Sequence, residues 1–455
     1  MAEFRIEHDA LGEMTVPADR YWGAQTQRSL QNFPIGNDKM PFEIIRAFAV
    51  LKKAAAHTNF KLGKLDQRRC DLISQVCDEI AAGKLDEHFP LSVWQTGSGT
   101  QTNMNLNEVI ANRGNEIVAE AILHPNDTVN MSQSSNDTFP TAMHIAAAQI
   151  VNELLLPALD EMIQTCWKLE NAHKGIIKIG RTHLQDATPI LFSQEISGWR
   201  GMIETAKKQI LLSCDGLYQL ALGGTAVGTG INAPENFDVE VAATIAEMIG
   251  LPFRTDPNKF HALTAKDDIV FSHGALKALA ADMMKIANDV RWLASGPRCG
   301  IGEICIPENE PGSSIMPGKV NPTQCESVTM VAVQVLANDS AVAMAASQGN
   351  FQLNVFMPVI IRNYLHSARL LSDSVRSFTQ RCLQGLEAKP DAMRNHLNRS
   401  LMLVTCLSPA IGYENAARAA RYAHENALTL RESVIHLNLM DGERFDLLVD
   451  PKKMV

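Results

Sequence analysis

The sequence has 455 residues, more than a single hydrophobic core usually organises, so we expect two or three structural segments. Hydrophobic residues make up 46% and charged residues 20% of the chain, which is ordinary for a globular protein and excludes a disordered one. The formal net charge of −9, from 41 Lys and Arg against 50 Asp and Glu, argues against nucleic acid or an anionic membrane as the partner.

The predicted elements begin with two short strands, around residues 4–6 and 14–16. Long helical runs follow, each longer than the average globular helix, at about 39–62, 106–122, 136–172, 190–221, 265–295, 323–348 and 353–385. Pro157 should kink the run that contains it. No alternation of β-branched residues is long enough for a large sheet, so the fold class is predicted to be all-α, with a long central helical bundle.

Three segments are expected along the chain. They are an N-terminal, mostly helical domain over residues 1–135, a central bundle of long helices over 136–355, and a small C-terminal helical domain over 356–455. Linkers rich in Pro or Ser are absent from the sequence. We therefore expect the segments to be packed together rather than tethered.

The protein is predicted to be cytoplasmic and free of membrane. Its nine cysteines are an odd number without a C-x-x-C pair, which is typical of a reducing compartment. The first residues, MAEFRIEHDALGEM, include no apolar stretch of the kind a signal peptide needs. The apolar stretch from Ser327 to Ala346 contains Gln334, Asn338 and Asp339, so it is predicted to be a helix buried in a bundle.

Between the helices lie polar loops rich in glycine, hydroxyl and amide side chains. They are QTGSGTQTNMN (95–105), HPNDTVNMSQSSND (124–137), GRTHLQDATP (180–189), GGTAVGTG (223–230) and PGSSIMPGKVNP (311–322). A helical bundle that presents such loops is suited to binding a small polar ligand.

The first and fourth of these loops invite a nucleotide interpretation, which the spacing does not support. The segment 97–100, GSGT, lacks the G-K-[ST] of a phosphate-binding loop, and it leads into a helix expected to begin near Asn105. Backbone N–H groups and hydroxyls in that position can instead hold a carboxylate. The loop 223–230 follows a helix rather than a strand, so dinucleotide binding is rejected.

No metal or other cofactor is predicted. The sequence has no H-x-x-x-H pair, no Cys/His cluster and no trio of acidic residues within a short window. An iron–sulfur enzyme would need three or more cysteines placed around a cluster, and this pattern is missing.

The loop 311–322 is the most specific signal in the sequence. Gly312 and Gly318 give the backbone freedom around Ser313 and Ser314, although most Gly/Pro loops are plain surface turns. Here GSSIMPGKVNPTQCE resembles the signature of the fumarase/aspartase superfamily almost letter for letter. Further segments similar to class II, metal-independent fumarases are RYWGAQTQRS (20–29), TGSGTQTNMNLNE (96–108), SQSSNDTFPTAMH (132–144), GRTHLQDATP (180–189) and GNFQLNVFMPVI (349–360).

This resemblance covers essentially the whole chain and implies a fold, an assembly and an activity. Members of the superfamily are long helical bundles that assemble as homotetramers, with each active site built from three subunits. Fumarases interconvert fumarate and L-malate by anti addition and elimination of water, a step of the tricarboxylic acid cycle. The expected partners are therefore these dicarboxylates and further copies of the chain.

The reaction explains why such residues are needed. Removal of the proton next to a carboxylate gives an aci-carboxylate with two negative charges, which donors and a cation must stabilise. The resemblance assigns that role to Lys319 and Asn321. It makes Ser313 the general base, places His183 on the acid side through a water, and pairs Glu326 with the histidine.

The resemblance also implies which side chains bind the substrate. The expected set is Ser98, Gly99, Thr100, Ser134, Ser135, Asn136, Thr182, Ser314, Lys319, Val320 and Asn321. A second, non-catalytic dicarboxylate site described for this class would use His124, Pro125, Asn126 and Asp127. A plain Pro-containing turn before a helix is an equally good interpretation of those four residues.

Aspartate ammonia-lyase is the alternative function. Aspartases resemble this chain in the loop 311–322, which we call the serine loop. They typically carry Ala at the position of Gly318 and Gln at that of His183. Hydroxide is a poor leaving group and needs an acid, so a histidine favours the hydratase. Argininosuccinate and adenylosuccinate lyases differ more in this loop, and a structural lens protein is disfavoured because Ser313, His183 and Lys319 are intact.

Helix length predicts how the site is shared. Three groups of loops are expected to form the site: the clamp loops, which contain Ser98–Thr100 and Ser134–Asn136, the histidine loop (180–189) and the serine loop (311–322). Long helices separate them, and a helix of about 30 residues spans roughly 45 Å. One chain cannot easily bring all three loops to one point. We therefore expect His183 and Ser313 in one site to come from different chains.

Overall fold

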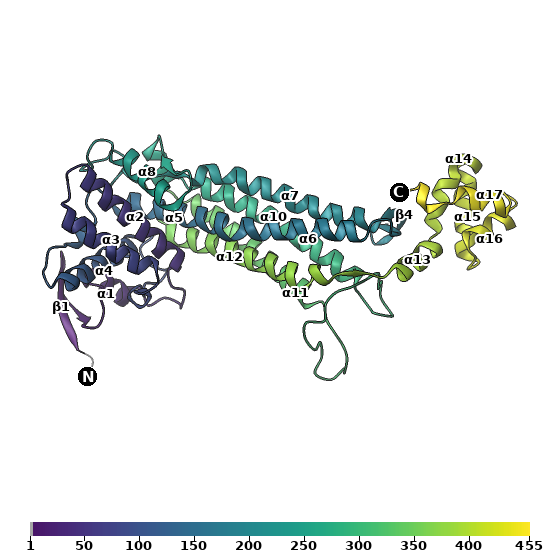
Figure 1. Cartoon of the computed structure of the whole chain (residues 1–455), viewed down its shortest axis with the longest axis horizontal. Helices are drawn as coiled ribbons and strands as arrows, with labels where there is room; N and C mark the ends of the chain where they lie inside the picture. Colours follow the sequence, from purple (N-terminus) through teal and green to yellow (C-terminus); the bar gives the residue numbers. More distant parts are fainter. Residues whose placement is uncertain (1–2) are drawn as a thin grey trace. The chain divides into compact units, whose positions relative to one another are not determined.

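The computed structural model describes residues 3–455 and confirms the all-α class (Figure 1). The chain starts with an antiparallel hairpin of β1 (Phe4–Asp9) and β2 (Gly12–Pro17), in which Asp9 lies opposite Gly12. Both predicted N-terminal strands are therefore confirmed. Gly12 has a φ of +109°, which a residue with a Cβ rarely adopts, and this allows the tight turn.

The first helices are α1 (Ala24–Asn32), α2 (Phe42–Lys61), α3 (Gln67–Ala81) and α4 (Thr100–Val118). The α2 helix packs against α3, α5 and α8, and this buries Phe48 and Leu51 completely. Asp66 caps α3 by accepting a hydrogen bond from Arg69 N–H. The α4 helix begins five residues before the predicted start at Asn105.

Besides α2 and α4, the other five long predicted helical runs are also present. They are α5 (Ser135–Ile150) with α6 (Leu156–Ala172), then α7 (Phe192–Leu217), α10 (Asp267–Leu293), α11 (Thr323–Ala346) and α12 (Met357–Arg381). A π-helical turn, η3 (Val151–Leu155), joins α5 to α6 directly before Pro157. Proline cannot donate a helical hydrogen bond, and such a turn accommodates the break in the ladder.

One predicted loop is wrong, because most of the segment 180–189 is a β-hairpin. Strand β3 (Ile177–Thr182) pairs antiparallel with β4 (Gln185–Leu191), with an irregularity between Ile179 and Arg181. Ile179 is buried in the hydrophobic cluster of the C-terminal helices. Packing against that distant part of the chain stabilises the strand, and the polar local sequence gives no sign of it.

Shorter elements complete the chain. They are η1 (Asp86–His88), η2 (Pro125–Val129), β5 (Gln219–Leu220), α8 (Phe237–Ile249), β6 (Arg254–Thr255), α9 (Lys259–Thr264), β7 (Ile304–Cys305), η4 (Leu383–Gly385), β8 (Glu387–Ala388), α13 (Pro390–Arg399), η5 (Leu401–Leu407), α14 (Ser408–Ile411), α15 (Tyr413–Glu425), α16 (Leu430–His436), α17 (Gly442–Leu448) and η6 (Pro451–Lys453). The π-helical turn η2 lies within the second polar loop.

The chain forms two compact units. Unit 1 comprises Met1–Pro157, Ala206–Ala280 and Val331–Ser372, and unit 2 comprises Ala158–Thr205, Ala281–Met330 and Asp373–Val455. The C-terminal helices of unit 2 share a core of Leu403, Leu407, Val434 and Phe445. The division into three segments at residues 135 and 355 stays a prediction.

Two helical stretches are long and apolar enough to cross a membrane by composition alone, Ser135–Ala172 and Thr323–Ala346. The most apolar window of the first is 67% buried, as expected of a core helix, whereas that of the second is only 33% buried. The α11 helix therefore presents an apolar face that the chain itself does not cover.

Candidate active site

The GSGT segment is shaped by glycines that no other residue could replace. A Cβ on Gly97 would lie 1.4 Å from the carbonyl oxygen of Val355, and one on Gly99 would lie 2.0 Å from the Phe139 ring. Gly99 also has a φ of +73° and directly precedes α4. The hydroxyls of Ser98 and Thr100 lie 2.9 Å apart, so two hydroxyls and the first N–H groups of α4 are gathered at one helix end.

The second predicted clamp lies at the start of α5. Ser134 and Asp137 form a capping box, in which each side chain accepts a hydrogen bond from the backbone of the other end. Asn103 donates to the hydroxyl of Ser135 (3.1 Å) from the neighbouring helix α4. Asn136 donates to the carbonyl of Ala226 at 2.8 Å. Hydrogen bonds to α4 on one side and to the loop 223–230 on the other therefore fix the segment 134–136.

The loop 223–230 supports this clamp rather than a nucleotide. The N–H groups of Gly223 and Thr225 donate to Asp137 Oδ2 at 3.0 and 2.9 Å. Burial raises the pKa of Asp137 to about 6, against the opposing effect of these backbone donors. Sequence reasoning missed Asp137, because an acidic residue in the first turn of a helix is usually an ordinary cap.

The segment His124–Asp127 is a helix cap in this chain. The N–H groups of Asn126 and Asp127 donate to His124 Nδ1 at 3.3 and 3.1 Å, and the π-helical turn η2 follows. Asn126 also lines a polar cavity of about 460 Å³, together with Asn130, Met131, Ser132, Gln133, Ser134, Ser135, Thr225, Ala226, Ile231 and Asn232. The second dicarboxylate site stays a prediction.

His183 lies at the tip of the β3–β4 hairpin in unit 2. His183 and Leu184 have φ angles of +56° and +59°, as the two central residues of a type I′ turn require. Thr182, His183 and Leu184 are all exposed. The imidazole is therefore presented to the surroundings rather than packed into the chain.

Behind the tip, a buried group of charges fixes the hairpin. Arg181 donates to both carboxylate oxygens of Glu303 at 2.9 and 3.0 Å, and Lys178 Nζ lies 2.7 Å from Glu195 and 3.1 Å from Glu303. Burial alone would raise the pKa of Glu303, but the hydrogen bonds from Arg181 and the charge of Lys178 hold it below its usual value. Lys178 and Glu303 support the hairpin, and no motif in the sequence marks either of them.

The serine loop folds back on itself. Gly312 N–H donates to the carbonyl of Lys319 at 2.7 Å, and the Asn321 amide donates to the carbonyl of Gly312 at 2.8 Å. Lys319 Nζ donates to Asn321 Oδ1 at 2.5 Å. The loop thus brings together Ser313, Lys319 and Asn321, three of the predicted catalytic residues.

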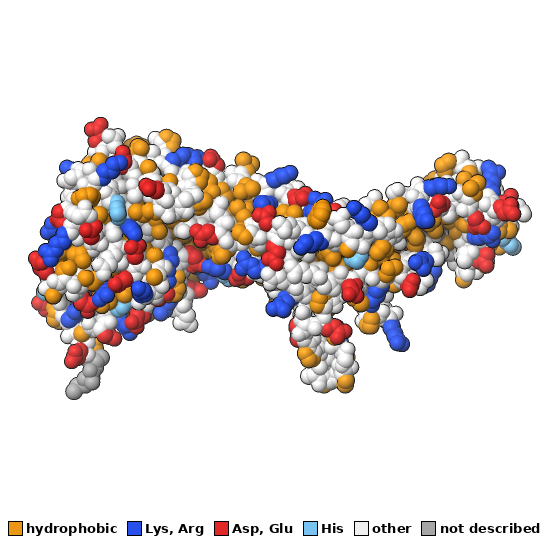
Figure 2. Space-filling view, in the orientation of Figure 1, with side chains coloured by type: hydrophobic (Ala, Val, Ile, Leu, Met, Phe, Trp, Pro, Cys, Tyr) orange, Lys and Arg blue, Asp and Glu red, His pale blue; other side chains and the backbone are white. Residues whose placement is uncertain are grey.

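Within this loop, the N–H groups of Ile315 and Met316 donate to Ser313 Oγ at 3.2 and 3.0 Å. Ser314 and Val320 are exposed, and Ile315 is 84% exposed. The loop stands away from the start of α11 in Figure 1, and Figure 2 shows it as a projection of mostly white and orange side chains.

Glu326 lies in the first turn of α11, and its side chain is exposed. Within residues 3–455, no hydrogen bond or ion pair joins Glu326 or Ser313 to His183 in the same chain. The proposed pairing of Glu326 with the histidine stays a prediction. The clamps at 98–100 and 134–136 belong to unit 1, whereas the histidine tip, the serine loop and Glu326 belong to unit 2.

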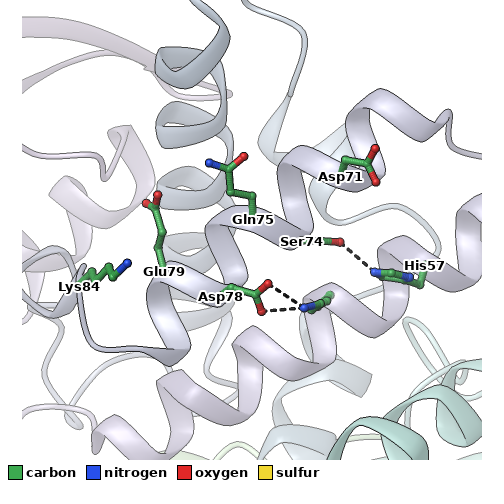
Figure 3. Close-up of a pocket in the computed structure, with 8 residues that line it drawn as sticks. His57, Asp71, Ser74, Gln75, Asp78, Glu79 and Lys84 are labelled. Atoms are coloured by element: carbon green, nitrogen blue, oxygen red, sulfur yellow. Dashed lines mark hydrogen bonds and ion pairs between the residues drawn. The ribbon is translucent and has the colours of Figure 1, made fainter.

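A larger depression, of about 540 Å³, is lined by residues of α2 and α3 and by Lys84 (Figure 3). Two of its side-chain pairs are local: Lys53 binds Asp78 at 2.7 Å, and His57 Nε2 lies 3.0 Å from the hydroxyl of Ser74. It contains no predicted site residue. Over the described residues, no group of three or more His, Cys, Asp or Glu side chains is arranged to hold a metal ion.

Comparison with known families identifies relatives over nearly the whole length. Residues 12–337 match the profile of a family described as lyase, and residues 403–455 match one described as the fumarase C C-terminus. The fumarate hydratase class II of Bacillus cereus is 59% identical over 457 residues, covering 100% of this chain and 99% of the relative. That of Bacillus subtilis is 58% identical with the same coverage.

Solved structures agree with the sequence relatives. The crystal structure of a recombinant class II fumarase from Schistosoma mansoni matches with a TM-score of 0.97 and 43% identity, over 99% of both chains. A fumarate lyase:delta crystallin from Brucella melitensis, in native form, matches with a TM-score of 0.88 and 38% identity, over 95% of this chain and 100% of the other.

Proposed function

The chain belongs to the lyase family that contains the class II fumarate hydratases, and we propose that it performs their reaction with the loops described above. It is a hydro-lyase that adds water to fumarate and removes water from L-malate. The substrates are therefore small dicarboxylates. The proposed setting is the tricarboxylic acid cycle in the cytoplasm, with no metal or other cofactor.

The observation that carries the catalytic assignment is the environment of Ser313 Oγ. A serine hydroxyl is a weak base, and an alkoxide needs donors around it. Two backbone N–H groups, from Ile315 and Met316, already point at this oxygen. Hydrogen bonds to the charged form lower the pKa of an acid, so this turn supports Ser313 as the general base.

Lys319 and Asn321 are proposed to stabilise the aci-carboxylate. The ammonium group supplies the positive charge, and the Asn321 amide is held in place by the carbonyl of Gly312. Because both residues belong to the folded loop that contains Ser313, proton removal and charge stabilisation would occur next to each other. Ser314 and Val320 would complete the contact with substrate through their exposed positions.

His183 is proposed to protonate the leaving hydroxide through a water, with Glu326 of a neighbouring copy setting its tautomer. The exposed hairpin tip and the rigid charge group behind it support this role, since an acid must be held firmly yet reach outward. Thr182 would bind the substrate beside it. Ser98, Gly99, Thr100, Ser134, Ser135 and Asn136 are the proposed clamps for the two carboxylates.

The chain is proposed to assemble as a homotetramer with shared sites. On α11, Met330, Val333 and Met344 are 67, 60 and 71% exposed, a large apolar surface for a protein in water. A second copy of the helix would cover it. The serine loop, with Ile315 exposed at its end, would then reach a neighbouring subunit.

Aspartate ammonia-lyase is the alternative, and a single assay separates the two. Fumarate absorbance is followed with L-malate or with L-aspartate as substrate. The proposed function requires fumarate formation from L-malate, and release from L-aspartate alone would contradict it. The same activity should survive exhaustive chelation and exposure to air, whereas loss with EDTA and recovery with Fe²⁺ or Mg²⁺ would contradict the metal-free mechanism.

A further inference from the structure

A buried lysine stands behind the α5 clamp. Lys52, in the middle of α2, has no exposed surface. Its ammonium group donates to Asn130 Oδ1 at 3.0 Å and to Gln133 Oε1 at 2.9 Å. Both acceptors are neutral amides. Within residues 3–455, no carboxylate lies close enough to Lys52 to form an ion pair.

A buried cation without a carboxylate partner is costly, because the charge has lost its water. The charged and titratable groups on the surrounding helices compensate the positive charge of Lys52 only in part. From α5, Asp137 is buried and binds three backbone N–H groups, those of Ser134, Gly223 and Thr225. From α3, Cys77 is a neutral thiol, because burial raises its pKa to about 12.

The other neighbouring elements add no countercharge at this point. From α4, Asn103 and Asn107 donate their amides to Asn130 Oδ1 at 3.1 Å each. From α8, Glu240 is paired with Lys61 at the end of α2. Lys52 therefore has two neutral amide oxygens as direct partners and the more distant charge of Asp137 as its countercharge, so a bound anion could complete the compensation of its positive charge.

The side chains that bind Lys52 also line the cavity next to Ser134 and Ser135, so they stand between the lysine and this cavity. Asn130 and Gln133, which bind the ammonium group, line the cavity of about 460 Å³ together with Ser134 and Ser135. Their oxygens face Lys52, while Asn130 Nδ2 donates to the carbonyl of Gln133. The first N–H groups of α5, which lack intrahelical acceptors, begin at the same place.

We propose that Lys52 is a positioning residue for substrate binding. Through Asn130 and Gln133 it fixes the turn that carries Ser134 and Ser135, and its buried charge favours a doubly charged dicarboxylate at the clamp. This inference rests on the proposed function, because it takes the clamp to be the place where the substrate carboxylate binds.

The charge on Lys52 varies within the working range of an enzyme. Burial lowers its pKa to about 7, although the charge of Asp137 acts in the opposite direction. A dianion bound at the clamp raises this pKa, because it favours the charged form. Substrate affinity is then highest when Lys52 is protonated, and it falls as the pH rises above about 7.

The test compares Michaelis constants of wild type and Lys52→Gln from pH 6 to pH 9. Glutamine keeps a donor for one of the two amide oxygens but has no charge. We expect kcat to change by less than about twofold and KM for L-malate to rise about tenfold at pH 6, which corresponds to one pKa unit. The KM ratio should fall towards one at pH 9, where wild-type Lys52 is neutral.

Two further variants make the result decisive. Lys53→Gln removes the adjacent lysine, which is partly exposed and bound to Asp78, and should leave KM unchanged at every pH. Lys52→Met replaces Lys52→Gln if the latter does not fold, because an apolar residue of similar volume is often tolerated at a buried charge. It should show the same pH-dependent ratio.

A KM ratio that stays constant with pH, or that equals one throughout, would overturn the role of Lys52. So would an equal effect in Lys53→Gln. Failure of the proposed function looks different, since wild type itself would then form no fumarate from L-malate.

Discussion

The two positive φ angles at the hairpin tip determine how His183 can be tested. Most substitutions at a φ of +56° would strain the turn and confuse a catalytic loss with a structural one. Asparagine adopts this conformation more readily than other residues with a side chain. His183→Asn therefore removes the imidazole while keeping the hairpin.

We expect His183→Asn to lower kcat by roughly a hundredfold or more, the usual size for one acid–base group. The melting temperature should change little, because the side chain is exposed and makes no hydrogen bond to any residue in the described range 3–455. Steady-state kinetics with L-malate and a thermal melt check both parts. Near wild-type turnover would show that His183 is not the acid.

His124→Asn is the matched control. His124 caps η2 by accepting from the N–H groups of Asn126 and Asp127, and asparagine is itself a good cap. The fold and kcat should therefore both be retained, since the second dicarboxylate site is expected to lie off the reaction path.

Lys266 gives a prediction about stability and pH. Its side chain is buried and donates to the carbonyls of Ala262, Leu263 and Ala265. Burial lowers its pKa to about 7. The unfolded chain keeps this proton up to a pH of about 10.4, so the unfolded state binds more protons between these values and stability rises with pH.

The stability of wild type relative to Lys266→Met should therefore increase by roughly 2–3 kcal/mol between pH 7 and pH 9, the equivalent of two pKa units. Urea unfolding at fixed protein concentration measures the difference. The exposed Lys64→Met serves as a control and should show no such trend. A difference that is independent of pH would mean that Lys266 keeps an ordinary pKa in the folded protein.

The sequence was sufficient to predict site residues that lie in loops of unusual composition. It was not sufficient to predict residues whose role depends on being buried. The loops with Ser98, Ser134, His183 and Ser313 stand out by composition and by resemblance. Lys52 does not, because it is one of two adjacent lysines in AVLKKAAA. Which of them is buried depends on how α2 is rotated against its neighbours, and only packing fixes that rotation.

At the scale of elements, long runs of helix-forming residues with few turn residues located all seven long helices. Most of these helices bury an apolar face within the chain, whereas α11 leaves much of its apolar surface uncovered. The β3–β4 hairpin was missed, since the segment around its turn is polar and its strands depend on Ile179 packing against distant helices. The start of α4 was placed five residues late, because Gly99 in a left-handed conformation lets the helix begin at Thr100.

The serine loop contains two glycines whose roles differ. A Cβ on Gly312 would lie 2.7 Å from the carbonyl oxygen of Lys319 and 2.9 Å from Asn321 N, both backbone atoms of the same loop. Gly318 has a φ of +79° but no atom within 4 Å of such a Cβ. A side chain at residue 312 would therefore clash with the backbone of the loop, whereas a side chain at residue 318 would only strain its own backbone conformation.

Gly312→Ala should therefore push Lys319 and Asn321 out of place and lower kcat/KM by about a hundredfold, a typical cost of misplacing catalytic groups by about 1 Å. Gly318→Ala should cost less, because left-handed strain amounts to roughly 1–2 kcal/mol and displaces no neighbour. Kinetics of both variants test the order. A larger loss in Gly318→Ala would show that the loop closes differently during catalysis.

At the scale of the whole molecule, the exposure of α11 indicates that the chain associates with other chains. Only 33% of the most apolar part of this helix is buried within one chain. Sequence reasoning predicted this helix to be buried in a bundle, which one chain does not provide. The missing burial is what association with other copies would supply. Oligomeric assembly could be expected from the sequence only through the resemblance, since hydropathy alone does not say which chain covers a helix.

The final prediction concerns how one active site is divided between chains. Neither Ser313 nor Glu326 contacts His183 within the described part of one chain, residues 3–455, and Ile315 of the serine loop is left exposed. If the loop acts on a neighbour, a site needs an intact His183 from one chain and an intact Ser313 from another. Inactive His183→Asn and inactive Ser313→Ala proteins, unfolded and refolded together, should then regain activity. Random assembly gives both residues to about one quarter of the sites, half the chains offering each residue. If both residues came from one chain, every site would contain a defect, and a mixture no more active than its parents would exclude the shared site.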